Sequence, residues 1–224
     1  MAVALLANTI ATGAGLGALI LTFGPISGAH FNPVVTLAEA LHGRCEWRVV
    51  PAYLLAQLSG SFAGVAIAHT MFGLPLFLAS HHARTGAAQC FSEFIATFGL
   101  LAVIQSTAHY RAAITPLAVA AYITAAYWFT ASTSFANPAV TLARAATDTF
   151  AGIRPLDAPG FIIAQLLGAG AATMLFRWLL AERRVSIEQE AACCAEVEAL
   201  QNALAIVSGV CSNPTWKAES GNFS

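Results

Sequence analysis

Two short segments carry the residues of this chain that are best suited to binding a polar molecule. They are Asn32-Pro33-Val34 and Asn137-Pro138-Ala139, in which an amide side chain stands directly before a proline. Because Asn is a favoured helix N-cap and Pro suits the first helical turn, each segment predicts the start of a helix. A helix start presents unpaired N–H groups and a positive dipole end, and the Asn amide adds further donors. The chemistry predicted here is hydrogen bonding to the oxygen atoms of a small molecule.

Both segments belong to a longer internal repeat. The run NPVVTLAEA over 32–40 matches NPAVTLARA over 137–145 at seven of nine positions, with an offset of 105 residues. A second match follows each run, AQLSG at 56–60 and AQLLG at 164–168. A single Asn-Pro is usually only a turn or cap signal, whereas a duplicated block of nine residues indicates that a larger unit was duplicated.

Composition indicates which elements must position these segments. Of 224 residues, 58% are hydrophobic and 9% are charged, whereas about a quarter of a soluble domain is charged. Five segments reach the length of about 20 apolar residues that a membrane-spanning helix needs. They cover roughly 3–24, 49–73, 88–108, 112–132 and 158–181. The apolar stretches 33–42 and 138–147 are too short to span, so we expect two half-helices inside an all-α membrane protein with five full transmembrane helices.

The distribution of arginines predicts the orientation in the membrane. Counting the crossings brings the two half-helices in from opposite faces, as in an inverted-topology repeat. The face of the first half-helix holds six arginines and the other face holds three. The six are Arg44, Arg48, Arg111, Arg177, Arg183 and Arg184, and the three are Arg84, Arg144 and Arg154. Because cytoplasmic loops are enriched in basic residues, we expect the Asn32 loop and the C-terminal tail on the cytoplasmic side of the inner (cell) membrane.

Two opposed half-helices also predict how molecules could pass. Irregular backbone is tolerated at membrane depth only where it is buried in protein or lines a cavity. Two helix N-termini that meet there form a positive centre, which repels cations and protons. Neutral polar molecules can pass by exchanging their hydrogen bonds to water for bonds to Asn32 and Asn137.

At these residues the sequence resembles the aquaporin (major intrinsic protein) family, over about residues 1–181. The run GPISGAHFNP at 24–33 is similar to the family's first pore loop, and SFANPA at 134–139 to its second. The resemblance implies an aquaporin-like inverted-repeat bundle, normally of six spanning helices and two half-helices, that assembles as a homotetramer in the lipid bilayer. It implies a passive channel for water and small neutral solutes that is not an enzyme and holds no cofactor or metal.

Two further residues take their expected roles from the resemblance. The run EFIAT at 93–97 is similar to the family's Glu-x-x-x-Thr motif, in which the Glu holds pore-loop backbone in place. Glu93 is alternatively an interfacial acid, although a carboxylate in the middle of a span is costly. His30, which stands beside Asn32, either lines the inner vestibule or makes a purely structural hydrogen bond.

The sequence departs from the family pattern around the pore. Val34 stands where Ala is usual, and Val140 stands where the outer constriction usually has Arg. By counting along the motifs, the four positions of that constriction are Thr12, Ala125, Ser134 and Val140. All four are small and uncharged, which implies a wider filter for glycerol-like polyols, urea or metalloid hydroxides such as arsenous acid, similar to bacterial arsenite-permeable aquaglyceroporins. The alternative is that these residues are ordinary packing or lipid-facing positions.

Internal symmetry predicts that the first repeat is incomplete. Glu93 lies 44 residues before Asn137, and the matching position before Asn32 would precede Met1. The family's first helix therefore has no counterpart, and we expect a poorly stable channel. The expected units are a channel domain over 1–181, with repeats over 1–74 and 88–181, and a polar tail over 182–224.

The sequence also predicts the character of the tail. The tail is expected to be cytoplasmic, with an amphipathic helix over 188–207 and a disordered end over 213–224. Its adjacent Cys193 and Cys194 either bind a thiophilic metalloid or have no role.

Two other functions stay open. A secondary transporter would also fit inverted repeats, but Glu93 is the only acid available for ion coupling. A non-conducting remnant would fit an incomplete repeat. The net charge of −1 gives no case for nucleic acid, and no nucleophile-base set or metal-ligand cluster supports an enzyme.

Overall fold

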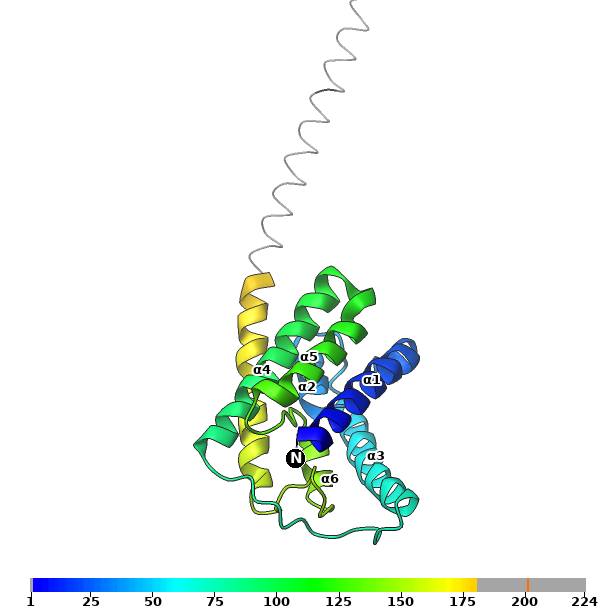
Figure 1. Ribbon diagram of the computed structural model, residues 1–224. Helices are drawn as coiled ribbons and strands as arrows, with labels where there is room; N and C mark the ends of the chain where they lie inside the picture. Colours follow the sequence, from blue (N-terminus) through cyan, green and yellow to red (C-terminus); the bar gives the residue numbers. More distant parts are fainter. Residues whose placement is uncertain (1, 181–200, 202–224) are drawn as a thin grey trace, which may run out of the picture. The chain divides into compact units, whose positions relative to one another are not determined.

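The computed structural model describes residues 2–180 and 201, and the elements within this part are helices, with no strand. Figure 1 shows α1 (Ala2–Ser27), α2 (Pro33–Leu41), α3 (Val50–Met71), α4 (Ala87–Tyr110), α5 (Thr115–Phe129), α6 (Pro138–Arg144) and an unlabelled helix at Ala158–Leu180. A 3-10 turn at Ala112–Ile114 leads into α5. Residues 1–177 form one compact unit, which contains every contact discussed below. The expectations for the tail helix and the disordered end lie outside the described residues.

The described helices confirm the predicted fold class. Five of them are long and apolar enough to cross a membrane, with 18 to 26 residues each when the 3-10 turn is counted with α5. The helices α2 and α6 have 9 and 7 residues and are too short to do so. Both begin at the proline of an Asn-Pro pair, as the capping argument predicts.

The first helix ends later than the sequence predicts. The resemblance placed the start of the first pore loop at Gly24, but α1 continues through Pro25 to Ser27. Pro25 removes one N–H from the helical ladder, yet the last turn is still closed by a bond from Gly28 N to Gly24 O at 2.9 Å. Pro25 lies two residues before the end of α1, so only the final turn of the helix follows the missing hydrogen bond.

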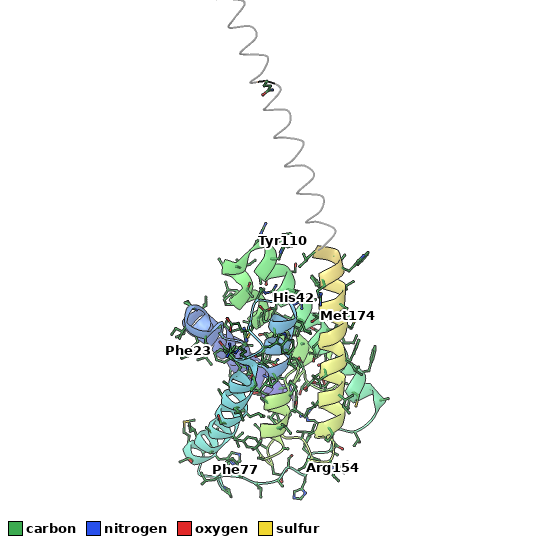
Figure 2. All side chains as sticks on the ribbon, turned by 180° about the vertical axis from the view of Figure 1, so that it is seen from behind. Phe23, His42, Phe77, Tyr110, Arg154 and Met174 are labelled. Atoms are coloured by element: carbon green, nitrogen blue, oxygen red, sulfur yellow. The ribbon has the colours of Figure 1, made fainter. Side chains whose placement is uncertain are left out.

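The chain alternates between two ends of the bundle. In Figure 2, His42 after α2 and Tyr110 at the end of α4 lie at one end, while Phe77 after α3 and Arg154 before the last helix lie at the other. This alternation is what the crossing order predicts for two repeats of opposite topology. The prediction of which end faces the cytoplasm stays a prediction.

Small residues set the distance between the spanning helices. A Cβ on Gly13 of α1 would lie 2.0 Å from Thr124 Oγ1 of α5, and one on Gly168 would lie 2.4 Å from the Phe94 carbonyl of α4. Both helix pairs therefore approach more closely than any side chain larger than hydrogen would allow. This is the packing expected in lipid, where helices associate through close van der Waals contact.

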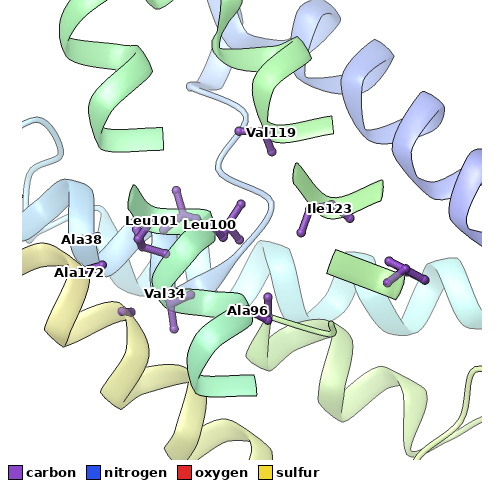
Figure 3. Packing of buried hydrophobic residues seen from close by; sticks show 12 residues of the cluster. Val34, Ala38, Ala96, Leu100, Leu101, Val119, Ile123 and Ala172 are labelled. Carbon is purple, nitrogen blue, oxygen red and sulfur yellow. The ribbon is translucent and has the colours of Figure 1, made fainter. Parts of the chain in front are cut away.

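The core of the bundle encloses the first half-helix. Figure 3 shows Val34 and Ala38 of α2 among Ala96, Leu100 and Leu101 of α4. The residues Val34 and Ala38 are only 1% and 2% exposed. The outer surface of the bundle also exposes large apolar side chains, as at Leu167, Met174 and Ile67. Such a surface suits contact with lipid rather than with water.

Candidate functional site

The two asparagines cap the half-helices that they precede. Asn32 Oδ1 accepts a hydrogen bond from Val34 N at 3.1 Å, and Asn137 Oδ1 accepts one from Ala139 N at 3.0 Å. Each amide oxygen is thus turned toward its own helix start, which directs the NH₂ group of the same amide away from that helix. The sequence alone predicts these two capping bonds.

The two amides also bind each other's loops in a reciprocal pair. Asn32 Nδ2 donates to the Ala136 carbonyl at 2.7 Å, and Asn137 Nδ2 donates to the Phe31 carbonyl at 2.8 Å. Each acceptor is the residue directly before the opposite asparagine. The bonds hold the N-termini of α2 and α6 together, so the two positive dipole ends meet at one place. Each NH₂ group has two hydrogens, and this pair of bonds uses one hydrogen of each.

The two pore loops share one unusual backbone conformation. Three positions in each have positive φ, and the positions match at the 105-residue offset. The pairs are Gly28 (73°) with Thr133 (60°), Ala29 (45°) with Ser134 (49°), and Phe31 (49°) with Ala136 (47°). Five of these six residues carry a side chain, and each such residue costs of the order of 1 kcal/mol or more in this region. The surrounding contacts must therefore hold both loops in place.

Glu93 provides that support for the second loop. Its carboxylate, 0% exposed, accepts from Phe135 N and Ala136 N at 2.8 Å each and from Gln165 Nε2 at 2.6 Å. Gln165 Nε2 also donates to Thr141 Oγ1 of α6 at 2.9 Å. Residues from α4, the loop, α6 and the last helix are thus joined at one buried charge, and these charge-assisted bonds offset the cost of burying it.

The first loop has an equivalent network without a carboxylate. Gln57 Nε2 donates to Thr36 Oγ1 at 2.9 Å, as Gln165 does to Thr141. The backbone N–H groups of His30 and Phe31, which match those bound by Glu93, have no acceptor in the part of the chain that the structure describes. Within that same part, Gln57 Oε1 and Gln165 Oε1 are both buried without a partner, so the difference between the networks is the carboxylate. The two loops therefore share a conformation but differ in what holds them.

Two cavities lie along α3 beside the asparagine pair. The first, which we call the His30 cavity, has a volume of about 680 Å³. It is lined by the end of α1, the first loop and α3, including Ser27, His30, Phe31, Tyr53, Gln57 and Ser61. His30 also contacts Thr36 Oγ1 at 3.1 Å through Nδ1, so it combines a cavity position with a structural hydrogen bond.

The second, which we call the Val140 cavity, has a volume of about 370 Å³. It is lined mainly by apolar residues of α3 together with Val140 and Arg144 of α6. Ser61 of α3 lines both cavities. The two cavities therefore adjoin the same turn of α3.

The structure places the four predicted constriction positions as follows, and their role as a filter stays a prediction. Val140 lines the Val140 cavity, whereas the other three positions do not. Thr12 is half-buried and contacts Tyr127, and Ala125 is exposed on α5. Ser134 is 2% exposed, and its hydroxyl has no partner within the described residues.

Known proteins that are similar to this chain show which family it belongs to. The family model described as Major intrinsic protein matches residues 1–131 and 112–213. The chain belongs to the major intrinsic protein family. It is 57% identical over 188 residues to the aquaglyceroporin AqpS of Rhizobium meliloti (strain 1021), covering 84% of this chain and 81% of that protein. It is 42% identical over 108 residues to the aquaporin NIP1-3 of Oryza sativa subsp. japonica, covering 46% of this chain and 38% of that protein.

Membership confirms the resemblance that the Asn-Pro motifs indicate. As a major intrinsic protein, the chain is a multi-pass membrane channel for water or small solutes and not an enzyme. The geometry of the site agrees with this, since the asparagine pair offers hydrogen bonds rather than a reactive group.

Arg144 was not among the site residues predicted from the sequence of this major intrinsic protein. Its Nη2 donates to Tyr127 Oη at 3.0 Å, and its Cζ lies 4.3 Å from the centre of the Phe135 ring. The available signal was the spacing, because Arg144 follows Val140 by four residues and so lies on the same face of α6. In the repeat alignment it also stands opposite Glu39, at one of the two mismatched positions.

Arg84 was missed as well, because no motif points to it. Its guanidinium donates to the carbonyls of Gly152 at 2.8 Å, Ser132 at 2.9 Å and Phe150 at 3.3 Å. Burial lowers the pKa of Arg84 to about 10, with a further lowering by the charge of Arg144. Arg84 is still protonated at neutral pH, so it joins three loop segments as a cation.

Proposed function

We propose that the chain is a passive channel for uncharged solutes larger than water, such as glycerol-like polyols, urea and metalloid hydroxides including arsenous acid, with water passing too. The observation that carries this proposal is the reciprocal asparagine pair next to a cavity in which position 140 is an uncharged valine. The name of the relative AqpS, an aquaglyceroporin, supports a cargo beyond water.

The proposed mechanism follows from the charges around the asparagine pair. A solute loses part of its water shell in the channel and replaces it with bonds to the remaining N–H groups of Asn32 and Asn137. Cations and protons meet the two positive dipole ends and the donors of the amides, which offer them no acceptor. The half-helices of this channel thus exclude ions while neutral molecules exchange hydrogen bonds.

The proposal includes the setting of the channel. The protein lies in the inner membrane, with the Asn32 loop and the tail on the cytoplasmic side, in keeping with the arginine distribution. It assembles as a homotetramer with one pore in each subunit. The apolar outer surface of the bundle supports contact with lipid or with other subunits.

Val140→Arg tests the cargo directly. A guanidinium at this position would narrow the Val140 cavity and add a fixed charge, so we expect glycerol flux to fall roughly tenfold more than water flux. Stopped-flow swelling of proteoliposomes with water, glycerol and arsenous acid in parallel measures this. Val140→Thr is the control, because it keeps the size of valine and adds no charge.

Three results would contradict the proposal. Equal losses of glycerol and water flux in Val140→Arg would remove Val140 from the filter. Flux that follows an ion gradient, instead of rising linearly with solute concentration, would indicate a secondary transporter. No flux from a chain shown to be folded would indicate a non-conducting protein.

A further inference from the structure

We propose that Arg144 is a specificity-determining residue of this channel, which supplies the cation that position 140 lacks. It selects small solutes with acceptor oxygens and no positive charge over cations of the same size. The inference rests on the proposed function, because it concerns which molecules enter the same pore.

The position of Arg144 is the first argument. It lies one helical turn after Val140 on α6, and both residues line the Val140 cavity. Most of the other lining side chains are apolar, as at Val65, Ala68 and Phe72. A charge beside apolar walls acts over a longer distance than one surrounded by water, because the local dielectric constant is lower.

The second argument is that Arg144 is held in place. Its Nη2 donates to the Tyr127 hydroxyl at 3.0 Å, and that hydroxyl contacts Thr12 Oγ1 at 3.4 Å. The guanidinium also lies over the ring of Phe135, which is the neighbour of Ser134. Arg144 is therefore linked to three constriction positions. It reaches Thr12 through Tyr127 and Ser134 through the neighbouring Phe135, and it shares a cavity with Val140. A charge fixed in this way acts on every solute that passes Val140.

The third argument is that the charge is available to a solute. The two ion pairs within the described residues are Arg44–Glu39 and Arg154–Asp157, so no carboxylate there forms a direct ion pair with Arg144. One of the five guanidinium N–H groups is used on Tyr127, and the described residues offer the others no hydrogen-bond acceptor. These donors can bind the oxygens of an entering molecule.

Arg84 shows the contrast with a structural cation. It also lies over the Phe135 ring, with 4.9 Å from its Cζ to the ring centre. Its three guanidinium nitrogens all donate to loop carbonyls, at Gly152, Ser132 and Phe150. Arg84 thus adds positive potential to this side of the pore, while Arg144 has donors to spare for a solute.

Urea and the guanidinium ion provide the sharpest test, because they are planar molecules of nearly equal size that differ in charge. Both fluxes are measured in proteoliposomes holding the full chain, urea by light scattering and guanidinium by isotope uptake. We expect the unmodified channel to pass urea and exclude guanidinium. In Arg144→Met the guanidinium-to-urea flux ratio should rise roughly tenfold, because a nearby fixed charge is removed.

Three variants complete the experiment. Arg144→Lys keeps the charge and should hold the ratio low, whereas Arg144→Gln removes the charge but can still donate to Tyr127. Arg144→Gln therefore tests the charge even if Arg144→Met does not fold. Arg111→Met is the matched control, because it removes an exposed arginine at the end of α4, away from α6.

The outcomes separate the inference from the proposed function. If the guanidinium-to-urea flux ratio rises in the Met and Gln variants of Arg144 and in no other variant, Arg144 is supported as the cation of the filter. An unchanged ratio in a folded, urea-conducting Arg144→Gln would overturn the inference and leave the channel proposal intact. An equal rise in Arg111→Met would also overturn it, since the effect would then be general. No urea flux in the unmodified protein would count against the proposed function itself.

Discussion

At the scale of single residues, the two pore loops differ in the charge that holds them. Glu93 accepts two backbone N–H groups of the second loop, while the matching N–H groups of His30 and Phe31 have no acceptor among residues 2–180. Both loops keep positive φ at three matching positions. Because positive φ is costly for residues with a side chain, the second loop needs the bonds to Glu93 to keep its conformation. We therefore expect that removing the Glu93 carboxylate destabilises the second loop.

Glu93→Gln tests this dependence. The amide keeps the shape of the carboxylate but replaces one acceptor oxygen with an NH₂ group that faces other donors. We expect the free energy of unfolding to fall by about 2–4 kcal/mol, measured by denaturation in detergent, together with a loss of solute flux.

Glu39→Gln is the matched control for this variant. Glu39 pairs with Arg44, and their side chains are 13% and 41% exposed. An ion pair that is open to solvent on one side contributes about 1 kcal/mol. Equal losses for the two variants would show that the buried bonds of Glu93 do not support the loop.

At the scale of elements, helix contacts position the two half-helices. The helix α1 packs against α5, and α3 packs against both α2 and α6. The close approach of α1 to α5 depends on Gly13, where a Cβ would collide with Thr124. Since Tyr127 of α5 contacts Thr12 of α1, this helix pair also sets the position of the Tyr127 hydroxyl that holds Arg144.

Gly13→Leu should therefore push α1 away from α5. We expect a loss of about 1–3 kcal/mol in the free energy of unfolding, since overpacking a tight contact forces backbone shifts. Thermal unfolding in detergent, followed by size-exclusion chromatography, measures the loss. The matched control is Gly15→Leu on the same helix, where a Cβ would meet nothing within 4 Å. Similar losses in both variants would mean that helix propensity or expression, and not the contact with α5, explains the effect.

At the scale of the whole molecule, the order of crossings places two sets of loops at opposite ends. The ends of α2 and α4 lie at one end, and the loops after α3 and before the last helix lie at the other (Figure 2). The arginine distribution predicts that the first of these ends is cytoplasmic.

Cysteine labelling in cells tests this orientation. His81 and Arg111 are both exposed and belong to opposite ends of the crossing order. A membrane-impermeant maleimide should label His81→Cys in intact cells, with the outer membrane made permeable, and Arg111→Cys only after the inner membrane is opened. The parent chain, which has five cysteines, provides the background to subtract. The reverse labelling pattern would show that the orientation proposed here is wrong.

Much of this architecture follows from the sequence because its signals are local. Apolar stretches of about 20 residues predict five spanning helices, and an Asn-Pro pair predicts where each half-helix begins. The motifs around Asn32 and Asn137 also indicate the family, which the comparisons confirm. The end of α1 was misplaced, because a proline near a helix terminus is compatible with either outcome.

Only the tertiary structure decided which groups meet across the bundle. The bond from Asn32 to the Ala136 carbonyl joins residues 104 apart, and the contact of Tyr127 with Thr12 joins residues 115 apart. Hydropathy and capping depend on neighbours along the chain, whereas such contacts depend on how closely the helices pack. The same reason explains why Val140 could be singled out from its motif. The spacing put Arg144 one turn further along the same helix face, but only the structure showed the side chains that hold it.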